Sequence, residues 1–159
     1  MQAYIGLGSN LEQPALQIKT AMIALNKLPG TQLLAQSSLY SSKPLGPQDQ
    51  PDFVNAVALI QTELAPLDLL NSLQAIEQQH GRIRKRHWGE RTLDLDILLF
   101  GDLTFQDERL VIPHKELTHR DFVLKPMLEI TPELCLPDGT ALSGFLVTCT
   151  DNQLSILSS

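Results

Sequence analysis

Apolar and polar positions along the first hundred residues follow two different periods. Short apolar runs bounded by Gly, Pro or polar residues favour strands, and apolar residues spaced three or four apart favour helices. Strands are predicted at residues 4–8, 31–42, 53–64 and 92–100. Helices are predicted at residues 10–28, with Asn10 as the N-terminal cap, and at residues 66–81. The resulting order is β-α-β-β-α-β.

This order predicts an α+β fold with a ferredoxin-like βαββαβ core. The two consecutive strands in the middle make a doubly wound parallel sheet a poor fit, so an antiparallel sheet in an α/β/α sandwich is expected. Shorter elements follow Gly101 as C-terminal additions, with a strand edge near residues 109–112, and the pattern leaves their order open. No repeat, low-complexity tract or linker divides residues 1–159, which are expected to form one domain.

Two carboxylates interrupt the most apolar of the predicted strands, RTLDLDILLF. Asp94 and Asp96 are two positions apart, so their side chains point to the same face of a strand. The apolar residues around them are expected to face the opposite side, into the core: Leu93, Leu95, Ile97 and Leu99. A carboxylate pair of this kind suits Mg²⁺, which also binds phosphate oxygens and water. The alternative is a structural ion pair with Arg91.

Five basic residues just before this strand favour the metal interpretation. They are Arg82, Arg84, Lys85, Arg86 and Arg91. Cationic side chains bind phosphates, and carboxylates hold the metal that neutralises them, which are the two requirements of phosphoryl transfer. Gly6 and Gly8 complete neither a P-loop nor a dinucleotide fingerprint. A tight strand-to-helix turn is therefore predicted as the main role of these glycines.

Composition narrows the classes of partner. The chain has 159 residues, of which 43% are hydrophobic, and a formal net charge of -6 at pH 7. This balance predicts a folded domain, and the negative charge argues against a protein that coats nucleic acid or an anionic membrane. Because the basic residues are concentrated in one loop, a small anionic ligand is favoured. Cys135 and Cys149 form no metal or secretory pattern, and no leader or apolar span is found, so a cytoplasmic protein is expected.

Four blocks of sequence, in order along the chain, carry a family resemblance. The most specific is HWGERTLDLDIL at residues 87–98. The others are GLGSNL at 6–11, PLGP and QPDFVNA within 44–56, and RLVIPH at 109–114. Together they resemble the 6-hydroxymethyl-7,8-dihydropterin pyrophosphokinase family, over about residues 3 to 140.

The resemblance implies a Mg²⁺-dependent transferase of folate biosynthesis. Such an enzyme moves the β,γ-pyrophosphoryl group of ATP to the hydroxymethyl group of the pterin and releases AMP. Two Mg²⁺ ions would be held by Asp94 and Asp96, and catalytic roles would fall on these residues together with Arg82 and Arg91. The expected partners are the two small-molecule substrates, without nucleic acid or membrane, and a monomer is expected.

The resemblance also implies two sets of binding residues. For ATP they are Gln74, Glu77, Arg84, Trp88, Arg91, Ile97, Arg109, His114 and Arg120. For the pterin they are Ser42, Lys43, Pro44, Leu45, Phe53, Asn55, Trp88, Asp94 and Phe122. Phe53 and Phe122 would stack on the two faces of the pterin ring, and Asn55 would bind its amide edge. Loops at residues 43–52 and 82–88 would close over the substrates and expel water.

A few positions depart from the commonest family pattern. Phe53 and Lys115 stand where a Tyr also occurs, and the cluster of Lys85, Arg86 and His87 has no assigned role. The general base is also unassigned. Two alternatives stay open: another metal-dependent nucleotidyl or phosphoryl transferase, and a ferredoxin-like module that binds RNA or an acidic partner. The aromatic content of 5% weighs against the RNA module, because RNA-binding sheets present stacking aromatics.

Overall fold

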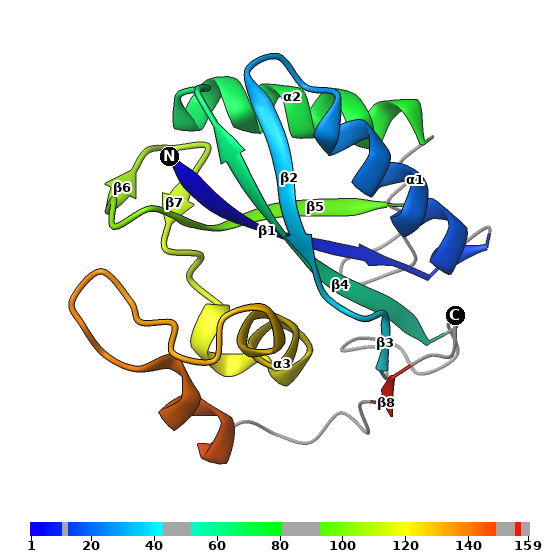
Figure 1. Cartoon of the computed structure of the whole chain (residues 1–159). Helices are drawn as coiled ribbons and strands as arrows, with labels where there is room; N and C mark the ends of the chain where they lie inside the picture. Colours follow the sequence, from blue (N-terminus) through cyan, green and yellow to red (C-terminus); the bar gives the residue numbers. More distant parts are fainter. Residues whose placement is uncertain (11–12, 43–51, 81–92, 149–154, 157–159) are drawn as a thin grey trace.

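An antiparallel sheet runs through the middle of the molecule (Figure 1). The structure is a computed structural model that describes residues 1–10, 13–42, 52–80, 93–148 and 155–156. Within these residues the sheet has six strands: β1 (Gln2–Ser9), β2 (Thr31–Gln36), β3 (Tyr40–Ser42), β4 (Phe53–Thr62), β5 (Asp94–Phe100) and β8 (Ser155–Ile156). A separate two-stranded sheet pairs β6 (Phe105–Gln106) with β7 (Val111–Ile112).

The order of the strands is β5-β1-β4-β3-β8, with β2 also paired to β4. Every pair is antiparallel. The first four predicted strands therefore lie in the ferredoxin-like order, with β1 and β4 in the centre, and the predicted fold class is confirmed. No helix of the described residues is long and apolar enough to cross a membrane.

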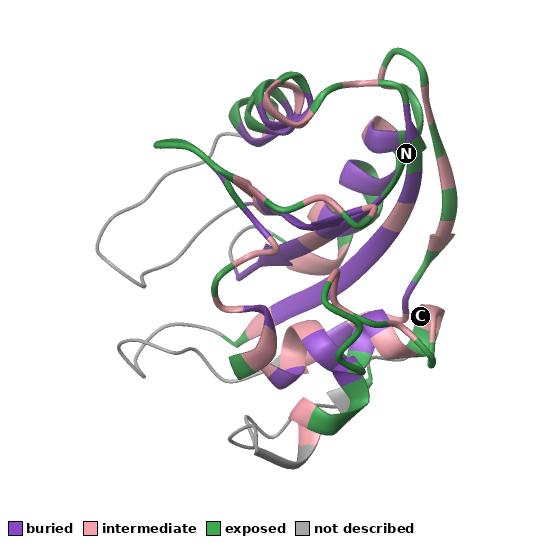
Figure 2. Cartoon of the chain, turned by 90° about the vertical axis from the view of Figure 1, so that its left-hand side faces the viewer, coloured by how far each residue is buried: buried purple, intermediate pink, exposed green. Residues whose placement is uncertain are grey.

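Helices cover both faces of this sheet (Figure 1). The helices are α1 (Pro14–Asn26), α2 (Pro66–Gln79) and α3 (Asp121–Ile130), with short 3₁₀ turns η1 (Leu117–His119) and η2 (Leu142–Thr148). The α1 and α2 side encloses the larger apolar cluster, which includes Ile5, Leu25, Ile60, Leu73 and Ile97. The α3 side encloses a second cluster, which includes Tyr4, Val57, Leu98, Leu124 and Met127. Figure 2 shows the strands buried between these layers.

A bulge in β5 corrects one prediction about the faces of this strand. Tyr4 pairs with Leu99 but the next residue, Ile5, pairs with Ile97, so Leu98 is the extra residue on β5. Leu98 and Leu99 both belong to the α3-side cluster. The prediction that Leu99 faces the same side as Ile97 is therefore wrong, because the bulge reverses the alternation after Ile97.

Helix α1 begins later than predicted. Its N-cap residue is Gln13, which has a φ of 62°, and Pro14 occupies the first turn. Asn10 is buried just after β1 and does not cap the helix. The cap prediction is wrong because Pro14, whose fixed φ suits the first helical position, sets the start. Leu16, an apolar residue in the first turn of this helix, is 56% exposed.

The predicted strand at residues 31–42 is divided by Ser37. The Ser37 N–H donates to the Val57 carbonyl (2.9 Å), but its Oγ accepts the Val57 N–H (2.9 Å) in place of a strand carbonyl. The Ser37 hydroxyl also donates to the Ser38 carbonyl (2.8 Å). One continuous strand was a wrong prediction because this side chain replaces a backbone acceptor of the ladder.

Helix α3 was not predicted, since Pro126 lies inside it and breaks the expected pattern. Its C-terminal end is held by a carboxylate. Glu129 accepts the Tyr40 hydroxyl (2.6 Å), the Ser38 hydroxyl (2.7 Å) and the Ser38 N–H (3.0 Å). Tyr4 and Thr131 add a hydroxyl pair at 2.6 Å. These contacts fix α3 to the sheet at β1 and at the chain entering β3.

The Glu129 contacts shift the pKa of both partners. Partial burial would raise the pKa of Glu129, but the hydrogen bonds from Tyr40 and Ser38 outweigh it and hold that pKa below its usual value. Burial first, and then the hydrogen bond and charge of Glu129, raise the pKa of Tyr40. The Glu129 contribution to stability is therefore present above the unfolded-state pKa and is lost as the pH falls through the folded-state pKa.

Replacement of Tyr40 by Phe should lower the free energy of unfolding by about 1 kcal/mol at pH 7, the usual net contribution of one hydrogen bond. The difference from the native chain should shrink as the pH falls from about 6 to about 3, because Glu129 becomes protonated. Urea unfolding at a series of pH values measures it. Tyr4→Phe is the matched control, since it removes a hydroxyl from the same helix end without a titrating partner. A pH-independent loss in Tyr40→Phe, or an equal pH dependence in both variants, contradicts this account.

Candidate active site

The two predicted metal ligands lie at the start of β5. Asp94 and Asp96 alternate with the buried Leu95 and Ile97, and both are half-buried. Their face of the sheet is the one that α3 covers, since the intervening residues belong to the opposite cluster. Alternation thus brings the carboxylates to the same face, as the sequence predicts.

Gly6 and Gly8 lie between this pair and β4, and not in a turn. Gly8 is paired with Asp94 on one side and Asn55 on the other, and Gly6 is paired with Asp96 and Val57. Paired residues of neighbouring strands point to the same face, so β1 presents no side chain between the carboxylates and β4. The predicted turn role is wrong: both glycines are interior strand residues.

The space above Gly8 is taken by Asn55. A Cβ at residue 8 would lie 3.1 Å from the Asn55 Oδ1, which is closer than an ordinary contact. The atoms nearest to a Cβ at Gly6 would be those of the Leu98 side chain, at 3.4 Å, an ordinary contact distance. The missing side chain at residue 8 therefore lets the Asn55 amide lie over β1, in the same cross-strand row as Asp94.

His114 lies beside the acidic pair in a defined protonation state. Its backbone N–H donates to the Leu98 carbonyl (3.0 Å), and its Nδ1 accepts the Glu116 N–H (3.1 Å). Burial, and then the charge of Arg120, lower the pKa of His114, although Glu116 and Asp94 act in the opposite direction. His114 is therefore neutral at pH 7, with its proton on Nε2, which lies 3.9 Å from the Asp96 Oδ1.

Arg120 and Phe122 approach the same region from the start of α3. The Arg120 guanidinium carbon lies 5.6 Å from the centre of the Phe122 ring. This arrangement is a cation–π contact. The effect of Arg120 on His114 places its positive charge near the acidic strand. The fold thus gathers Asp94, Asp96, His114, Arg120 and Phe122, although sequence reasoning did not predict the helix that carries two of them.

Arg109 is held against the exposed face of α2. One of its terminal nitrogens donates to the Asn71 Oδ1 (2.5 Å) and to the Gln74 Oε1 (3.2 Å). Its backbone N–H donates to the Asp107 Oδ1 (2.9 Å). Two predicted ATP residues, Gln74 and Arg109, are therefore neighbours. Asn71 was not predicted, and its place one turn before Gln74 is the signal that could have indicated it.

Two predicted ATP residues have buried side chains. Ile97 is 2% exposed and packs in the cluster of the α1 and α2 side. Glu77 is 5% exposed and its Oε2 accepts the Leu95 N–H at 2.7 Å. On β4, Phe53 is half-buried and pairs with Ser42 of β3, and its position alternates with the α1-side residue Val54. Phe53 and Asn55 therefore share the α3 side with Phe122.

Several predicted residues lie outside the described part of the chain. They are Lys43, Pro44, Leu45, Arg82, Arg84, Trp88 and Arg91. Of Ser42 only the backbone, in β3, is described. Within the described ranges, no three His, Cys, Asp or Glu side chains are grouped so as to hold a metal ion.

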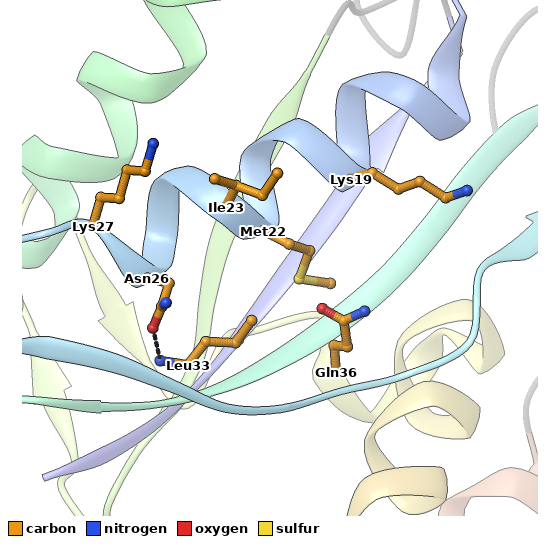
Figure 3. A pocket seen from close by; sticks show the side chains of 7 residues that line it. All are labelled: Lys19, Met22, Ile23, Asn26, Lys27, Leu33 and Gln36. Carbon is orange, nitrogen blue, oxygen red and sulfur yellow. Dashed lines mark hydrogen bonds between the residues drawn. The ribbon is translucent and has the colours of Figure 1, made fainter.

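A groove of about 280 Å³ lies elsewhere, between α1 and β2 (Figure 3). Its lining residues are Lys19, Met22, Ile23, Asn26, Lys27, Leu33 and Gln36. The Asn26 Oδ1 closes one part of it by accepting the Leu33 N–H (2.8 Å). None of the predicted site residues lines this groove, which is on the opposite face of the sheet from the acidic pair.

Comparison with known proteins identifies the family. The family model for 7,8-dihydro-6-hydroxymethylpterin-pyrophosphokinase (HPPK) matches residues 4–132. The chain belongs to the HPPK family. It is 53% identical over 152 residues to the 2-amino-4-hydroxy-6-hydroxymethyldihydropteridine pyrophosphokinase of Haemophilus influenzae, covering 96% of this chain and 95% of that protein. The enzyme of the same name from Pseudomonas aeruginosa is 53% identical over 148 residues, with 93% and 91% covered.

Solved structures agree with the HPPK fold at lower identity. The crystal structure of Plasmodium falciparum HPPK-DHPS with SDX-DHP has a TM-score of 0.72 and 18% identity to this chain. The match covers 92% of this chain but only 43% of the Plasmodium chain. This likeness supports the fold alone.

Replacement of Gly8 by Ala should lower the free energy of unfolding by about 1–3 kcal/mol, because the new methyl group displaces the buried Asn55 amide. Gly6→Ala should be nearly neutral, or stabilising by about 0.4–1 kcal/mol, since its methyl group fits and the unfolded chain loses freedom. Urea unfolding compares the two, and the Asn55 side-chain amide signals in NMR spectra should move only in Gly8→Ala. Equal stability in the two variants would show that Asn55 does not depend on the space at Gly8.

Proposed function

We propose that this chain transfers the pyrophosphoryl group of ATP to the hydroxymethyl group of 6-hydroxymethyl-7,8-dihydropterin, with AMP as the second product, in folate biosynthesis. The observation that carries this proposal is membership of the HPPK family over residues 4–132. The Haemophilus enzyme supports it over nearly the whole length of both chains. In this reaction the hydroxymethyl oxygen bonds to the β-phosphorus, the bond from that phosphorus to the α,β-bridging oxygen breaks, and the electron pair leaves on AMP.

The described residues suit a pterin on the α3 side of the sheet. Phe53 on β4 and Phe122 on α3 supply aromatic faces for a flat ring. Asn55, which the absent side chain of Gly8 accommodates, supplies an amide that can pair with the polar edge of the ring. Together these residues orient the hydroxymethyl group toward the acidic strand, since Asp94 lies in the same row as Asn55.

The described residues also offer donors for the phosphates of ATP. Arg120, Arg109 and His114 supply N–H donors that can bind phosphate oxygens. Arg109 is already oriented by Asn71 and Gln74. Arg82, Arg84, Arg91 and Trp88, which lie outside the described residues, are proposed to close over the substrates on the strength of the family resemblance, as are Lys43, Pro44 and Leu45.

The residues present fit Mg²⁺. Asp94 and Asp96 present two carboxylates on the same face, and the Asp96 side chain is 45% exposed, so water and phosphate oxygens can complete an octahedral shell. When bound, the ion neutralises charge on the phosphate oxygens. We propose two such ions. We further propose a monomeric, single-domain cytoplasmic enzyme that acts on these small molecules.

Purified protein incubated with ATP, Mg²⁺ and the hydroxymethyl dihydropterin should release AMP and form the pterin diphosphate in equal amounts. Separation of the nucleotides by ion-exchange chromatography measures this. Chelation of Mg²⁺ should abolish turnover, and its return should restore it. ADP as the product would indicate an ordinary kinase instead, and AMP release independent of the pterin would contradict the proposed acceptor.

Replacement of Asp96 by Asn should lower kcat by about 10²–10³-fold, the usual cost of one group that stabilises charge in the transition state. The free energy of unfolding without ligands should stay the same or rise, because the repulsion between two neighbouring carboxylates is relieved. Steady-state kinetics and urea unfolding measure these effects.

Asp102→Asn is the control for Asp96→Asn, since Asp102 is an exposed carboxylate in the turn that follows β5. Asp102→Asn should leave both kcat and the free energy of unfolding unchanged. A large loss of stability in Asp96→Asn with activity retained would show that the carboxylate is structural.

A further inference from the structure

The buried carboxylate of Glu77 lies on the inner face of α2. Leu69, Leu70, Leu73 and Ile76 cover this face with apolar side chains, and Glu77 is only 5% exposed beside them. Burial of a charged carboxylate costs several kcal/mol unless hydrogen bonds compensate it. A residue of this type on an otherwise apolar face therefore calls for a specific partner.

The partner of Glu77 is the backbone between the two aspartates. Its Oε2 accepts the Leu95 N–H at 2.7 Å, a short, charge-assisted hydrogen bond. β5 is the outermost strand of the described sheet and pairs with β1, and the hydrogen bond of the Leu95 N–H to Glu77 shows that this N–H points away from the ladder. The Glu77 carboxylate thus accepts the hydrogen bond that a further strand would otherwise accept. It does so at Leu95, the single residue between Asp94 and Asp96.

We propose that Glu77 is a positioning residue that sets the geometry of the Asp94 and Asp96 carboxylates. The orientation of the two side chains depends on the peptide planes on either side of Leu95, and the Glu77 hydrogen bond fixes one of these planes. This inference rests on the proposed role of the aspartates as Mg²⁺ ligands, and Glu77 itself does not contact the reacting atoms.

Helix α2 can carry this role because it is firmly placed. Its four buried apolar residues anchor it on the sheet, while Gln74 on its exposed face helps to hold Arg109. Gln74 is exposed and Glu77 is buried, so the same helix holds a cation at its surface and contacts the acidic strand from its buried side. A direct contact of Glu77 with ATP is disfavoured by the burial of its carboxylate.

Two substitutions test whether Glu77 acts as a hydrogen-bond acceptor or through its negative charge. Glu77→Gln keeps an acceptor oxygen of the same reach, whereas Glu77→Met keeps the length and removes the acceptor. The Leu95 amide, followed by hydrogen exchange in NMR spectra of the ligand-free protein, should stay protected in Glu77→Gln and lose protection in Glu77→Met. In kinetics, Glu77→Met should raise the Mg²⁺ concentration for half-maximal rate about tenfold or more, the order expected for a lost hydrogen bond to a charged group. In Glu77→Gln, this Mg²⁺ concentration should stay close to that of the native chain.

Ile76→Ala is the control for a general loss of stability. It removes a buried side chain from the same helix and should weaken folding without shifting the Mg²⁺ dependence. An equal Mg²⁺ shift in Ile76→Ala, or equal effects of Gln and Met at residue 77, would overturn the proposal. A raised KM for ATP in Glu77→Gln with normal Mg²⁺ activation would also overturn it, in favour of a nucleotide contact.

The same experiments distinguish this inference from the wider function. If the native chain gives no pterin-dependent AMP, or if Asp96→Asn leaves the Mg²⁺ dependence unchanged, the proposed function or metal site fails. If both behave as expected but Glu77→Met does not differ from Glu77→Gln, only the role of Glu77 fails.

Discussion

The site depends on the register of β1 between β4 and β5. This register places Gly8 between Asn55 and Asp94 and Gly6 between Val57 and Asp96. A shift of one residue would turn Leu7 or Ser9 toward α3 and fill the space beside the carboxylates, because side chains alternate between the faces. The apolar residues Ile5 and Leu7, buried on the other face, hold the register. The hydrophobic core and the opening of the site are thus two consequences of one strand pairing.

His114 and Arg120 approach the acidic pair from the chain that follows β7. His114 is neutral at pH 7, since burial and Arg120 lower its pKa, so its 3.9 Å approach to Asp96 is not a charge pair. The cation of Arg120 rests on the Phe122 ring. Two carboxylates side by side repel each other, and a bound cation relieves that repulsion.

The parts of this structure that sequence predicts are those set by regular periods. Alternation placed Asp94 and Asp96 on one face, and the order of strands and helices indicated the ferredoxin-like core. The predictions that were wrong concern places where a local feature interrupts those periods. The bulge at Leu98 reverses the facing of Leu99, Ser37 replaces a backbone acceptor within a strand, and Pro126 obscures α3. The Glu77 hydrogen bond joins a helix to a strand 18 residues later, which no local pattern reveals.

The site has a metal half, which is the acidic pair on β5, and an aromatic half, which includes Phe53 and Phe122. Different elements support the two halves. The acidic strand is fixed on its outer edge by Glu77 of α2, and α2 belongs to the larger apolar cluster. Phe122 is carried by α3, which is fixed at its far end by Glu129 to Ser38 and Tyr40 and packs in the other cluster. Tyr40 pairs with Asn55, so the Glu129 contacts adjoin the β4 residues that face the pterin. A perturbation of α3 therefore acts first on the aromatic half, and a perturbation of α2 on the metal half. β1 pairs with β5 on the side of the acidic pair and with β4 on the side of the aromatic residues, so its two glycines lie between the two halves of the site.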